Sequence, residues 1–395
     1  MNTAYEAERM KTIPFSGIRK VFEKVVELEH AGEDIVKFIT GRPDFDTPHH
    51  IKEAAKQALD EGFVHYTSNY GIPELLDLIS RKLEAVNHVS YNPKGEIIVT
   101  AGANEAVFLV MMGLLNPGDE VLIPDPIWLH YYYCAGLASA KVVPVPLQEK
   151  HDFTMDPADI EDRITEKTQM IVINSPHNPT GAVMEADRLR EIARIAKKHN
   201  LLIVSDEIYE HIIYDGVKHF SIASIPDARE RTITINGFSK SYSMTGWRLG
   251  YVAAPAELIS VMNRVHQYTT VCANSFAQKG AAAALEGGME CVHDMVKEFD
   301  ARRKLIVSLM HDIPGFDCGT PKGAFYAFPS IQKTGMSSLE MTDYLLHEAQ
   351  VAVVPGSVFG KQGEGYLRFS YAASQDDIRE GLKRIKAAME RRNQI

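Results

Sequence analysis

The sequence predicts an α/β fold in which helices cover both faces of a mostly parallel sheet. Seven short apolar runs follow one another between residues 97 and 254, and charged amphipathic stretches separate several of them. Strands that are apolar throughout are typical of parallel sheets buried on both faces, and their alternation with helices is typical of α/β domains. Because 395 residues exceed what one hydrophobic core usually supports, we expect two domains.

The order of the runs predicts where the two domains divide. The seven predicted strands cover residues 97–100, 120–123, 141–145, 170–174, 201–205, 232–235 and 249–254. Helices are expected from Asn104 and over residues 187–199. After about residue 290 the pattern changes to a long helix, short strands and a final helix over 374–391. We therefore expect a large domain over residues 48–289 and a smaller α+β domain over 290–395, which the N-terminal segment 1–47 joins.

Composition and charge exclude several classes of function. The formal net charge is −10, and no block of basic residues interrupts the acidic balance, which argues against a nucleic-acid partner. The four cysteines form no C-x-x-C pair, as expected of a reduced cytoplasmic chain. Residues 1–11 have no apolar core that would make them a secretory signal, and the longest apolar stretch, 106–115, is too short to span a bilayer. We expect a soluble, cytoplasmic protein with no membrane partner.

One lysine has neighbours that suit a covalent bond with an aldehyde. Lys240 lies in the segment 237–248, GFSKSYSMTGWR, directly after the apolar run 232–235. Small neighbours let an aldehyde cofactor reach the amine and form a Schiff base. The hydroxyl groups beside the lysine and the guanidinium of Arg248 can bind the phosphate of such a cofactor. Taken alone, a lysine in such a segment would more often be a solvated lysine in a polar loop.

An aspartate at the end of another predicted strand points to the same cofactor. Asp206 follows the run 201–205, and a buried aspartate is costly unless it pairs with a cation. A protonated pyridine nitrogen is such a cation, and Tyr209 could then hydrogen-bond the phenolic oxygen of the same ring. The alternative for Asp206 alone is a helix N-cap.

Three further polar clusters lie at strand ends or within a strand. Residues 174–181, NSPHNPTG, form a turn that could present the amide of Asn178, and residues 101–106, AGANEA, could bring backbone N–H groups to a phosphate. Arg368 lies inside an alternating strand and could bind a carboxylate through two hydrogen bonds. Each has a plainer alternative: an Asx-type turn, a tight strand-to-helix turn, or an arginine on an edge strand. Clusters at the carboxyl ends of strands could converge on one crevice.

In combination these motifs resemble the class I/II aminotransferases of pyridoxal-phosphate fold type I, over essentially the whole chain. The family's motifs occur in the family's order: Gly41-Arg42-Pro43-Asp44-Phe45, Tyr66 with Gly71, Gly102 to Asn104, Asn178-Pro179-Thr180-Gly181, Asp206 with Tyr209, Ser239-Lys240, Arg248 and Arg368. Residues 236–254 and 351–357 look closest to archaeal-type aromatic aminotransferases of the I-gamma branch. The resemblance implies pyridoxal 5′-phosphate as cofactor, no metal, and a homodimer with composite active sites.

The resemblance also implies a role for each matching residue. Lys240 looks like the Schiff-base lysine and proton shuttle, Asp206 like the partner of the ring nitrogen, and Tyr209 with Asn178 like the ligands of the ring oxygen. The other implied cofactor contacts are Trp128 stacked on the ring, Gly102, Ala103, Asn104, Ser239 and Arg248 around the phosphate, and Tyr66 reaching the phosphate from the other subunit. The implied substrate site consists of Gly41 and Arg368, which hold the α-carboxylate, together with Trp128 and Asn178.

Two departures from the family pattern bear on the substrate. Gly237 stands where many relatives carry a second phosphate-binding serine, and Asn104 stands where aspartate-preferring relatives of the branch carry a lysine. We therefore expect an aromatic or other neutral L-amino acid, or else aspartate, to donate its amino group to 2-oxoglutarate by a ping-pong route. Arg19 is a candidate for binding a second substrate carboxylate.

Other functions remain open at this point. One alternative is an aspartate-specific aminotransferase, and another is a carbon–sulfur β-lyase of the same fold, which would release pyruvate and ammonia from a cysteine conjugate. A cofactor-binding regulator of transcription is a third class, but it would need a fused DNA-binding module, and the chain has no basic segment for one.

Overall fold

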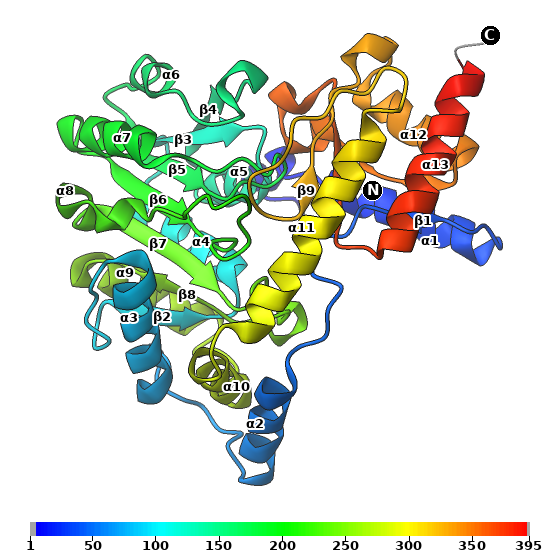
Figure 1. Ribbon diagram of the computed structural model, residues 1–395. Helices are drawn as coiled ribbons and strands as arrows, with labels where there is room; N and C mark the ends of the chain where they lie inside the picture. The colour runs from blue at the N-terminus through cyan, green and yellow to red at the C-terminus, as the bar shows by residue number, and fades with distance from the viewer. Residues whose placement is uncertain (1–4, 393–395) are drawn as a thin grey trace.

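A seven-stranded sheet forms the centre of the computed structural model, which describes residues 5–392 (Figure 1). Its strands are β2 (Ile97–Thr100), β3 (Glu120–Asp125), β4 (Lys141–Pro146), β5 (Thr168–Asn174), β6 (Leu202–Asp206), β7 (Thr232–Gly237) and β8 (Gly250–Ala253). Their order in the sheet is β2-β8-β7-β6-β5-β3-β4. Neighbouring strands are parallel, except that β8 is antiparallel to both β2 and β7. The prediction of a mostly parallel, seven-stranded sheet is confirmed.

The central strands are buried on both faces because their side chains alternate between two apolar layers. In β3, Val121 and Ile123 belong to one core cluster, while Leu122 between them belongs to another. Helices α4 (Ala103–Leu114), α5 (His130–Leu137) and α9 (Ala256–Thr269) share the first cluster; α6 (Pro157–Glu161), α7 (Ala186–Lys198) and α8 (Pro226–Arg229) share the second. Each large aliphatic side chain buried in this way contributes about 1.5–3 kcal/mol.

Helices α2 (His49–Asp60), α3 (Pro73–Asn87) and α10 (Ser275–Glu286) pack together beside β2 and β8. The core there includes Ile97, Val99 and Tyr251 from the strands. Pro73 occupies the first turn of α3, where a missing N–H costs no helical hydrogen bond. None of the helices within residues 5–392 has the length and apolar character needed to cross a membrane.

Short strands at the two ends of the chain pair with each other. β1 (Val36–Lys37) runs parallel to β10 (Val351–Ala352), and β11 (Val354–Pro355), β12 (Leu367–Ser370) and β9 (Tyr326–Ala327) form a three-stranded antiparallel sheet. The helices of this region are α1 (Gly17–His30), α11 (Glu290–Met310), α12 (Ser338–Glu348) and α13 (Gln375–Arg392). In Figure 1 the blue elements α1 and β1 therefore lie beside the red C-terminal helix α13.

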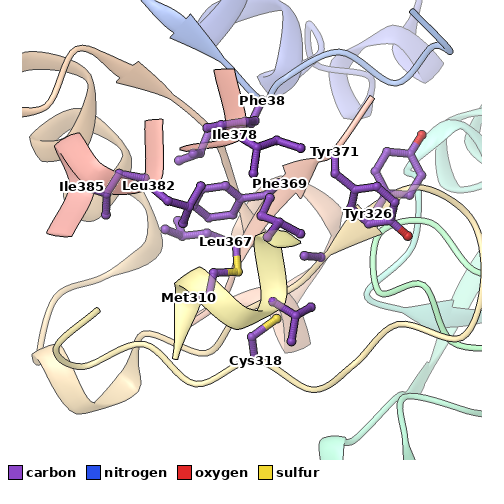
Figure 2. Packing of buried hydrophobic residues seen from close by; sticks show 14 of the residues in the cluster. Phe38, Met310, Cys318, Tyr326, Leu367, Phe369, Tyr371, Ile378, Leu382 and Ile385 are labelled. Carbon is purple, nitrogen blue, oxygen red and sulfur yellow. The ribbon is translucent and has the colours of Figure 1, made fainter. Parts of the chain in front are cut away.

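A separate apolar cluster fills the space between these terminal elements. Phe38 and Phe369 pack with ring centroids 5.6 Å apart, beside Ile378 and Leu382 from α13 (Figure 2). Tyr326 lies at the edge of the same cluster. The packing joins residue 38 to the last helix, so the early and late parts of the chain share one core.

Candidate active site

Residues that end or follow β5, β6 and β7 line a cavity of about 340 Å³. The parallel register explains their convergence, because Asn174 at the end of β5 pairs with Asp206 at the end of β6. The predicted site residues that line the cavity are Gly41, Ala103, Asn104, Trp128, Asn178, Asp206, Tyr209, Ser239, Lys240, Arg248 and Arg368. The other two predicted residues, Gly102 and Tyr66, do not line it.

Lys240 follows β7 and is only partly buried, with its amine directed to the N-terminal segment. Its Nζ donates a hydrogen bond to the carbonyl oxygen of Gly41 at 2.6 Å. Removal from water lowers the pKa of Lys240 to about 8; the guanidinium of Arg368 adds to the lowering, whereas Asp206 acts in the opposite direction. A useful fraction of the amine is therefore neutral near physiological pH, as a nucleophile or a base must be.

Asp206 is a buried carboxylate that makes no ion pair within residues 5–392. It is 4% exposed, Oδ1 accepts the Ile208 N–H at 3.0 Å, and Oδ2 accepts the hydroxyl of Tyr131. Burial raises the pKa of Asp206 to about 6, although both hydrogen bonds act to lower it. A cation bound beside Asp206 would bring the pKa back down and keep the carboxylate charged.

Tyr209 and Asn178 present polar atoms to the same cavity from two different loops. The Tyr209 hydroxyl lies 2.8 Å from the hydroxyl of Tyr326. Asn178 is held at its backbone, where its N–H donates to Oδ1 of Asn174 at 3.0 Å. Its side-chain Nδ2 makes no hydrogen bond within residues 5–392, so this donor is available to a ligand.

A basic, donor-rich corner of the cavity lies at the start of α4. Gly102 caps this helix with a φ of 85°, and a Cβ at Gly102 would lie 2.5 Å from Nη2 of Arg248. Glycine is thus needed for the guanidinium to approach the helix N-terminus, whose first N–H groups have no intrahelical acceptor. The hydroxyl of Ser239 lies at the same cavity. Such a corner suits a phosphate group.

Arg368 is a buried cation without a counter-ion in the described part of the chain. It is 2% exposed; Nη2 donates to the carbonyl oxygen of Ile39 at 2.7 Å, and Nη1 to Oδ1 of Asn178 at 3.3 Å. Its Nε has no hydrogen-bond partner among the residues that the structure describes. The guanidinium lies between the rings of Tyr326 and Phe359, at 4.7 Å and 5.0 Å from their centroids. A buried, incompletely bonded guanidinium suits a carboxylate ligand.

Trp128 and Tyr66, two aromatic residues of the predicted site, lie in different places, one at the cavity and one on the surface. Trp128 lines the cavity and stacks on His130, with ring centroids 4.8 Å apart. Tyr66 is 84% exposed and lies on the outer surface beside Val64 and Ser275, not at the cavity of its own chain. Tyr66 therefore does not contribute to the cavity of its own chain.

Close packing explains why residue 237 is a glycine, and the position of Arg19 removes it as a candidate for binding a second substrate carboxylate. A Cβ at Gly237 would lie 2.8 Å from the Cα of Gly250, so the backbone there leaves no room for a serine side chain. Arg19 does not line the cavity; its side chain is 73% exposed and forms an ion pair with Glu23 along α1. Arg42, which was not singled out from the sequence, is exposed and does line the cavity.

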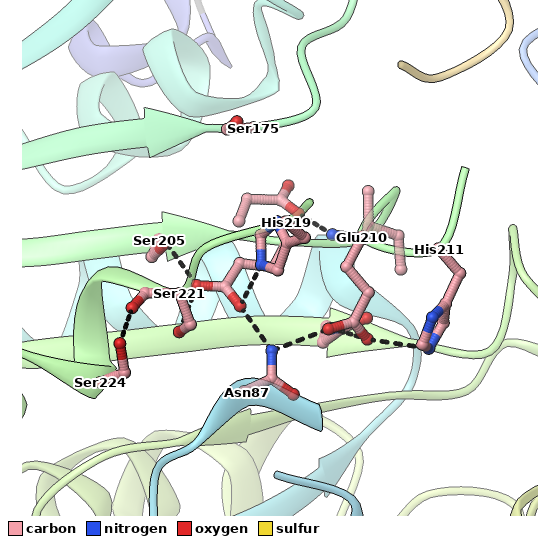
Figure 3. Close-up of polar contacts among 12 residues, drawn as sticks. Asn87, Ser175, Ser205, Glu210, His211, His219, Ser221 and Ser224 are labelled. Atoms are coloured by element: carbon pink, nitrogen blue, oxygen red, sulfur yellow. Dashed lines mark hydrogen bonds and ion pairs between the residues drawn. The ribbon is translucent and has the colours of Figure 1, made fainter. Parts of the chain in front are cut away.

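Behind the segment that carries Asp206 and Tyr209, two buried glutamates form a polar network (Figure 3). Asn87 of α3 donates to Glu207 at 3.0 Å and to Glu210 at 2.8 Å, and Lys82 forms an ion pair with Glu210. Burial opposes the charge of Glu210, but Lys82 holds its pKa at about 2. The other partners are Ser205, His219 and Ser221 around Glu207, and Asn236 and His211 around Glu210. The network fixes the segment to α3 and β7.

Two tyrosines that line the cavity and bond to predicted site residues were also missed from the sequence. Tyr131, three residues after Trp128, binds Asp206, and Tyr326 binds Tyr209. The tyrosine three positions past an aromatic cavity residue, in the helix that follows it, was a usable signal for Tyr131. Tyr326 gave no comparable signal, because its run Ala324-Phe325-Tyr326-Ala327 reads as an ordinary buried strand.

Comparison with known proteins agrees with this geometry. A family model described as aminotransferase class I and II matches residues 33–385. The chain is 45% identical over 385 residues to an aspartate aminotransferase of Pyrococcus abyssi, covering 97% of this chain and 98% of the relative. It is 42% identical over 391 residues to aromatic-amino-acid aminotransferase 2 of Thermococcus litoralis, covering 98% and 99%.

Solved structures show the same fold. The aromatic aminotransferase of Pyrococcus horikoshii superimposes with a TM-score of 0.90 at 44% identity, covering 94% of this chain and 100% of that one. The aspartate aminotransferase of Thermus thermophilus with maleate gives a TM-score of 0.92 at 37% identity, covering 97% and 99%. The chain belongs to the class I and II aminotransferase family.

Proposed function

We propose that this aminotransferase uses pyridoxal 5′-phosphate to move an amino group from an L-amino acid to 2-oxoglutarate by a ping-pong route. One observation carries the proposal. A single cavity wall combines the low-pKa amine of Lys240, the buried carboxylate of Asp206 and the buried guanidinium of Arg368, and the last two have no charged partner within residues 5–392. Uncompensated buried charges of opposite sign are costly unless a ligand supplies both partners.

The donor set fits this cofactor. Asp206 would pair with the protonated ring nitrogen, and Asn178 with Tyr209 would donate to the ring oxygen. Arg248, Ser239 and the N-terminus of α4 from Gly102 to Asn104 would hold the phosphate. Trp128 would cover the ring face.

The catalytic work of the chain centres on proton transfer by Lys240. When bound, pyridoxal 5′-phosphate withdraws electrons from the α-carbon of an amino acid and makes its α-proton acidic. With a pKa of about 8, the Lys240 amine can take this proton as a base and give it back as an acid. Its hydrogen bond to the Gly41 carbonyl fixes its direction, and Arg368 holds the substrate carboxylate beside it.

The side-chain pocket supports an aromatic or other neutral donor, with aspartate as the alternative. Ile18 and Ile39 give one part of the cavity an apolar lining, and Asn104 adds no charge. The similar proteins carry both names, aspartate and aromatic aminotransferase. A dicarboxylate such as 2-oxoglutarate still needs a second cation, and Arg42 is the remaining cationic lining residue once Lys240, Arg248 and Arg368 are assigned.

We further propose a cytoplasmic homodimer with composite active sites. Tyr66 projects from the surface, which suits a residue that reaches the phosphate of the other subunit. We also propose that residues 48–289 form a large domain and that residues 1–47 and 290–395 form a small one; the pairing of β1 with β10 supports this division. Residues 1–4 and 393–395 of these ranges lie outside the described residues.

A panel of amino donors tests the proposed function. The purified chain is loaded with pyridoxal 5′-phosphate, and each donor is supplied with and without 2-oxoglutarate. Each active donor should give about one equivalent of 2-oxo acid per site alone and continuous turnover only with the acceptor, and Lys240→Ala should give neither. Continuous release of pyruvate and ammonia from a cysteine conjugate without acceptor would instead identify the β-lyase and contradict the proposal.

A further inference from the structure

Tyr326 contacts two proposed functional groups at once, although it comes from a distant part of the chain. It belongs to β9, where Tyr326 pairs with Ser370 of β12, two residues from Arg368. The side chain is fully buried at the edge of the apolar cluster, in contact with the ring of Phe325 at 4.8 Å between centroids (Figure 2). It nevertheless lines the cavity.

The hydroxyl of Tyr326 makes one hydrogen bond within residues 5–392, and its partner is the hydroxyl of Tyr209 at 2.8 Å. The Tyr209 hydroxyl likewise has no other partner there. A phenol has one hydrogen to donate. If Tyr209 donates its hydrogen to a ligand in the cavity, its oxygen must therefore accept from Tyr326. Such a chain of hydroxyl donors strengthens the outer hydrogen bond.

The ring of Tyr326 performs a second task. Its centroid lies 4.7 Å from the guanidinium carbon of Arg368, close enough for a cation–π contact. Because Arg368 donates to only two acceptors within residues 5–392, this ring and that of Phe359 restrict where the guanidinium can lie. Gly41 lies close against this pair, since a Cβ there would lie 3.0 Å from the Tyr326 hydroxyl and would displace it by a few tenths of an ångström.

We propose that Tyr326 is a positioning residue that directs the Tyr209 hydroxyl hydrogen towards the ring oxygen of the cofactor and holds Arg368 for the substrate carboxylate. This inference rests on the proposed function. Tyr209 also faces the titratable groups of Lys240, Asp206 and Tyr131, and the guanidinium groups of Arg42 and Arg248 line the same cavity. The two tasks belong to different parts of the side chain, so two substitutions can separate them.

Tyr326→Phe removes the hydroxyl and keeps the ring. Tyr209 then loses its donor and binds the ring oxygen less strongly, so more negative charge remains on that oxygen and favours protonation of the nearby Lys240 nitrogen. The pH midpoint of the cofactor's visible absorbance should rise by about 0.5 unit or more. We expect kcat to fall between about 3-fold and 10-fold, with KM for amino acids nearly unchanged.

Tyr326→Leu also removes the ring, so KM for every amino acid should rise by about 10-fold in addition. Tyr371→Phe is the matched control: Tyr371 is buried in the same cluster and bonds Tyr214 and the Ala324 carbonyl, but it does not line the cavity. It should change thermal stability without moving the absorbance midpoint.

An unchanged midpoint in Tyr326→Phe, or an equal shift in Tyr371→Phe, would overturn the positioning role. Failure of the proposed function looks different, because it is seen in the wild-type chain itself: either no cofactor absorbance and no single-turnover reaction with any amino acid, or continuous release of pyruvate and ammonia from a cysteine conjugate without acceptor.

Discussion

The hydroxyl of Tyr131 donates a hydrogen bond to Oδ2 of Asp206, and both side chains are buried. Tyr131 thus supplies part of the stabilisation that a cation would otherwise give the carboxylate. Its ring also packs edge-on against Trp128, with centroids 6.2 Å apart. One residue of α5 therefore connects the proposed partner of the ring nitrogen with the proposed ring-stacking residue.

Tyr131→Phe should weaken catalysis without removing a charge. The loss of a hydrogen bond to a charged group corresponds to a fall in kcat of about 10-fold to 100-fold. Because this hydrogen bond lowers the pKa of Asp206, its loss should move the acidic limb of the kcat profile to higher pH. Tyr132→Phe is the control, since the Tyr132 hydroxyl has no hydrogen-bond partner in the described part of the chain, residues 5–392. Equal pH profiles for the two variants would contradict the assignment.

Asp206→Ala should be more severe than Tyr131→Phe. Without the carboxylate the ring nitrogen has no anion to keep it protonated, so we expect kcat to fall by at least ~100-fold. Asp206→Glu keeps the charge and should retain more activity than the alanine variant. The measurement is the steady-state rate of each variant, loaded with cofactor, compared with that of the loaded wild type. Near-normal turnover by Asp206→Ala would rule out the role of Asp206 as partner of the ring nitrogen.

The pKa of Lys240 predicts how cofactor attachment depends on pH. Attack on an aldehyde needs the neutral amine, whose fraction grows as the pH rises through about 8. The attachment rate to apoprotein, followed by absorbance between about pH 6 and 9.5, should rise accordingly and level off above this midpoint. Borohydride reduction should fix the cofactor on Lys240. Lys218→Ala, at an exposed lysine, should behave as wild type; an adduct mapped to another lysine would refute the assignment.

The network beneath Asp206 should stabilise the fold in a pH-dependent way. The pKa of Glu210 is about 2, against 4.5 for the free side chain, so its stabilisation is fully present above pH 4.5 and is lost as the pH falls towards 2. Glu210→Gln leaves Lys82 without its charged partner and should lower the free energy of unfolding by about 3–5 kcal/mol at neutral pH. Urea unfolding at neutral and acidic pH should show this difference shrinking with acidification. Exposed Glu230→Gln should show no such difference.

Local sequence patterns were enough to predict strands that are apolar throughout and the amphipathic helices between them. Residues 232–235 were expected to be extended and form part of β7, and the helix expected over 187–199 is α7, one residue earlier. The antiparallel direction of β8 was not predictable, because a buried central strand has the same composition in either direction. Strand ends were the useful guide, since Asp206 and Lys240 are cavity residues that follow apolar runs.

Contacts between distant segments could not be predicted in the same way. Tyr326 reaches Tyr209 only because β9 pairs with β12, and these strands have two and four residues, too few for a periodic signal. Nothing in the sequence favours Arg42 over Arg19, since both lie in the N-terminal segment that precedes the predicted sheet. Only the course of the chain after α1 brings residue 42 to the cavity.

The exposed position of Tyr66 predicts complementation between subunits. Tyr66→Phe alone should weaken cofactor binding, and Lys240→Ala alone should abolish turnover. In a mixed dimer, one composite site would contain wild-type residues on both sides. Mixing the two variants should therefore restore activity above the sum of the separate proteins. A fully active monomer by sedimentation at assay concentration would contradict the composite site.

Substrate choice should separate the two cations that Arg368 and Arg42 bring to the cavity. Arg368→Ala should depress kcat/KM for all substrates by roughly 100-fold or more, because every substrate has an α-carboxylate. Arg42→Gln should depress kcat/KM for 2-oxoglutarate and aspartate by about 10-fold or more, while the phenylalanine single turnover stays unchanged. Arg19→Gln, outside the cavity, is the matched control.

With apolar Ile18 and Ile39 in the lining, phenylalanine and tyrosine should match or exceed aspartate as donors. A wild-type kcat/KM for aspartate more than about tenfold above theirs would disprove the preference, because one decade, about 1.4 kcal/mol, is what a single added charge contact supplies.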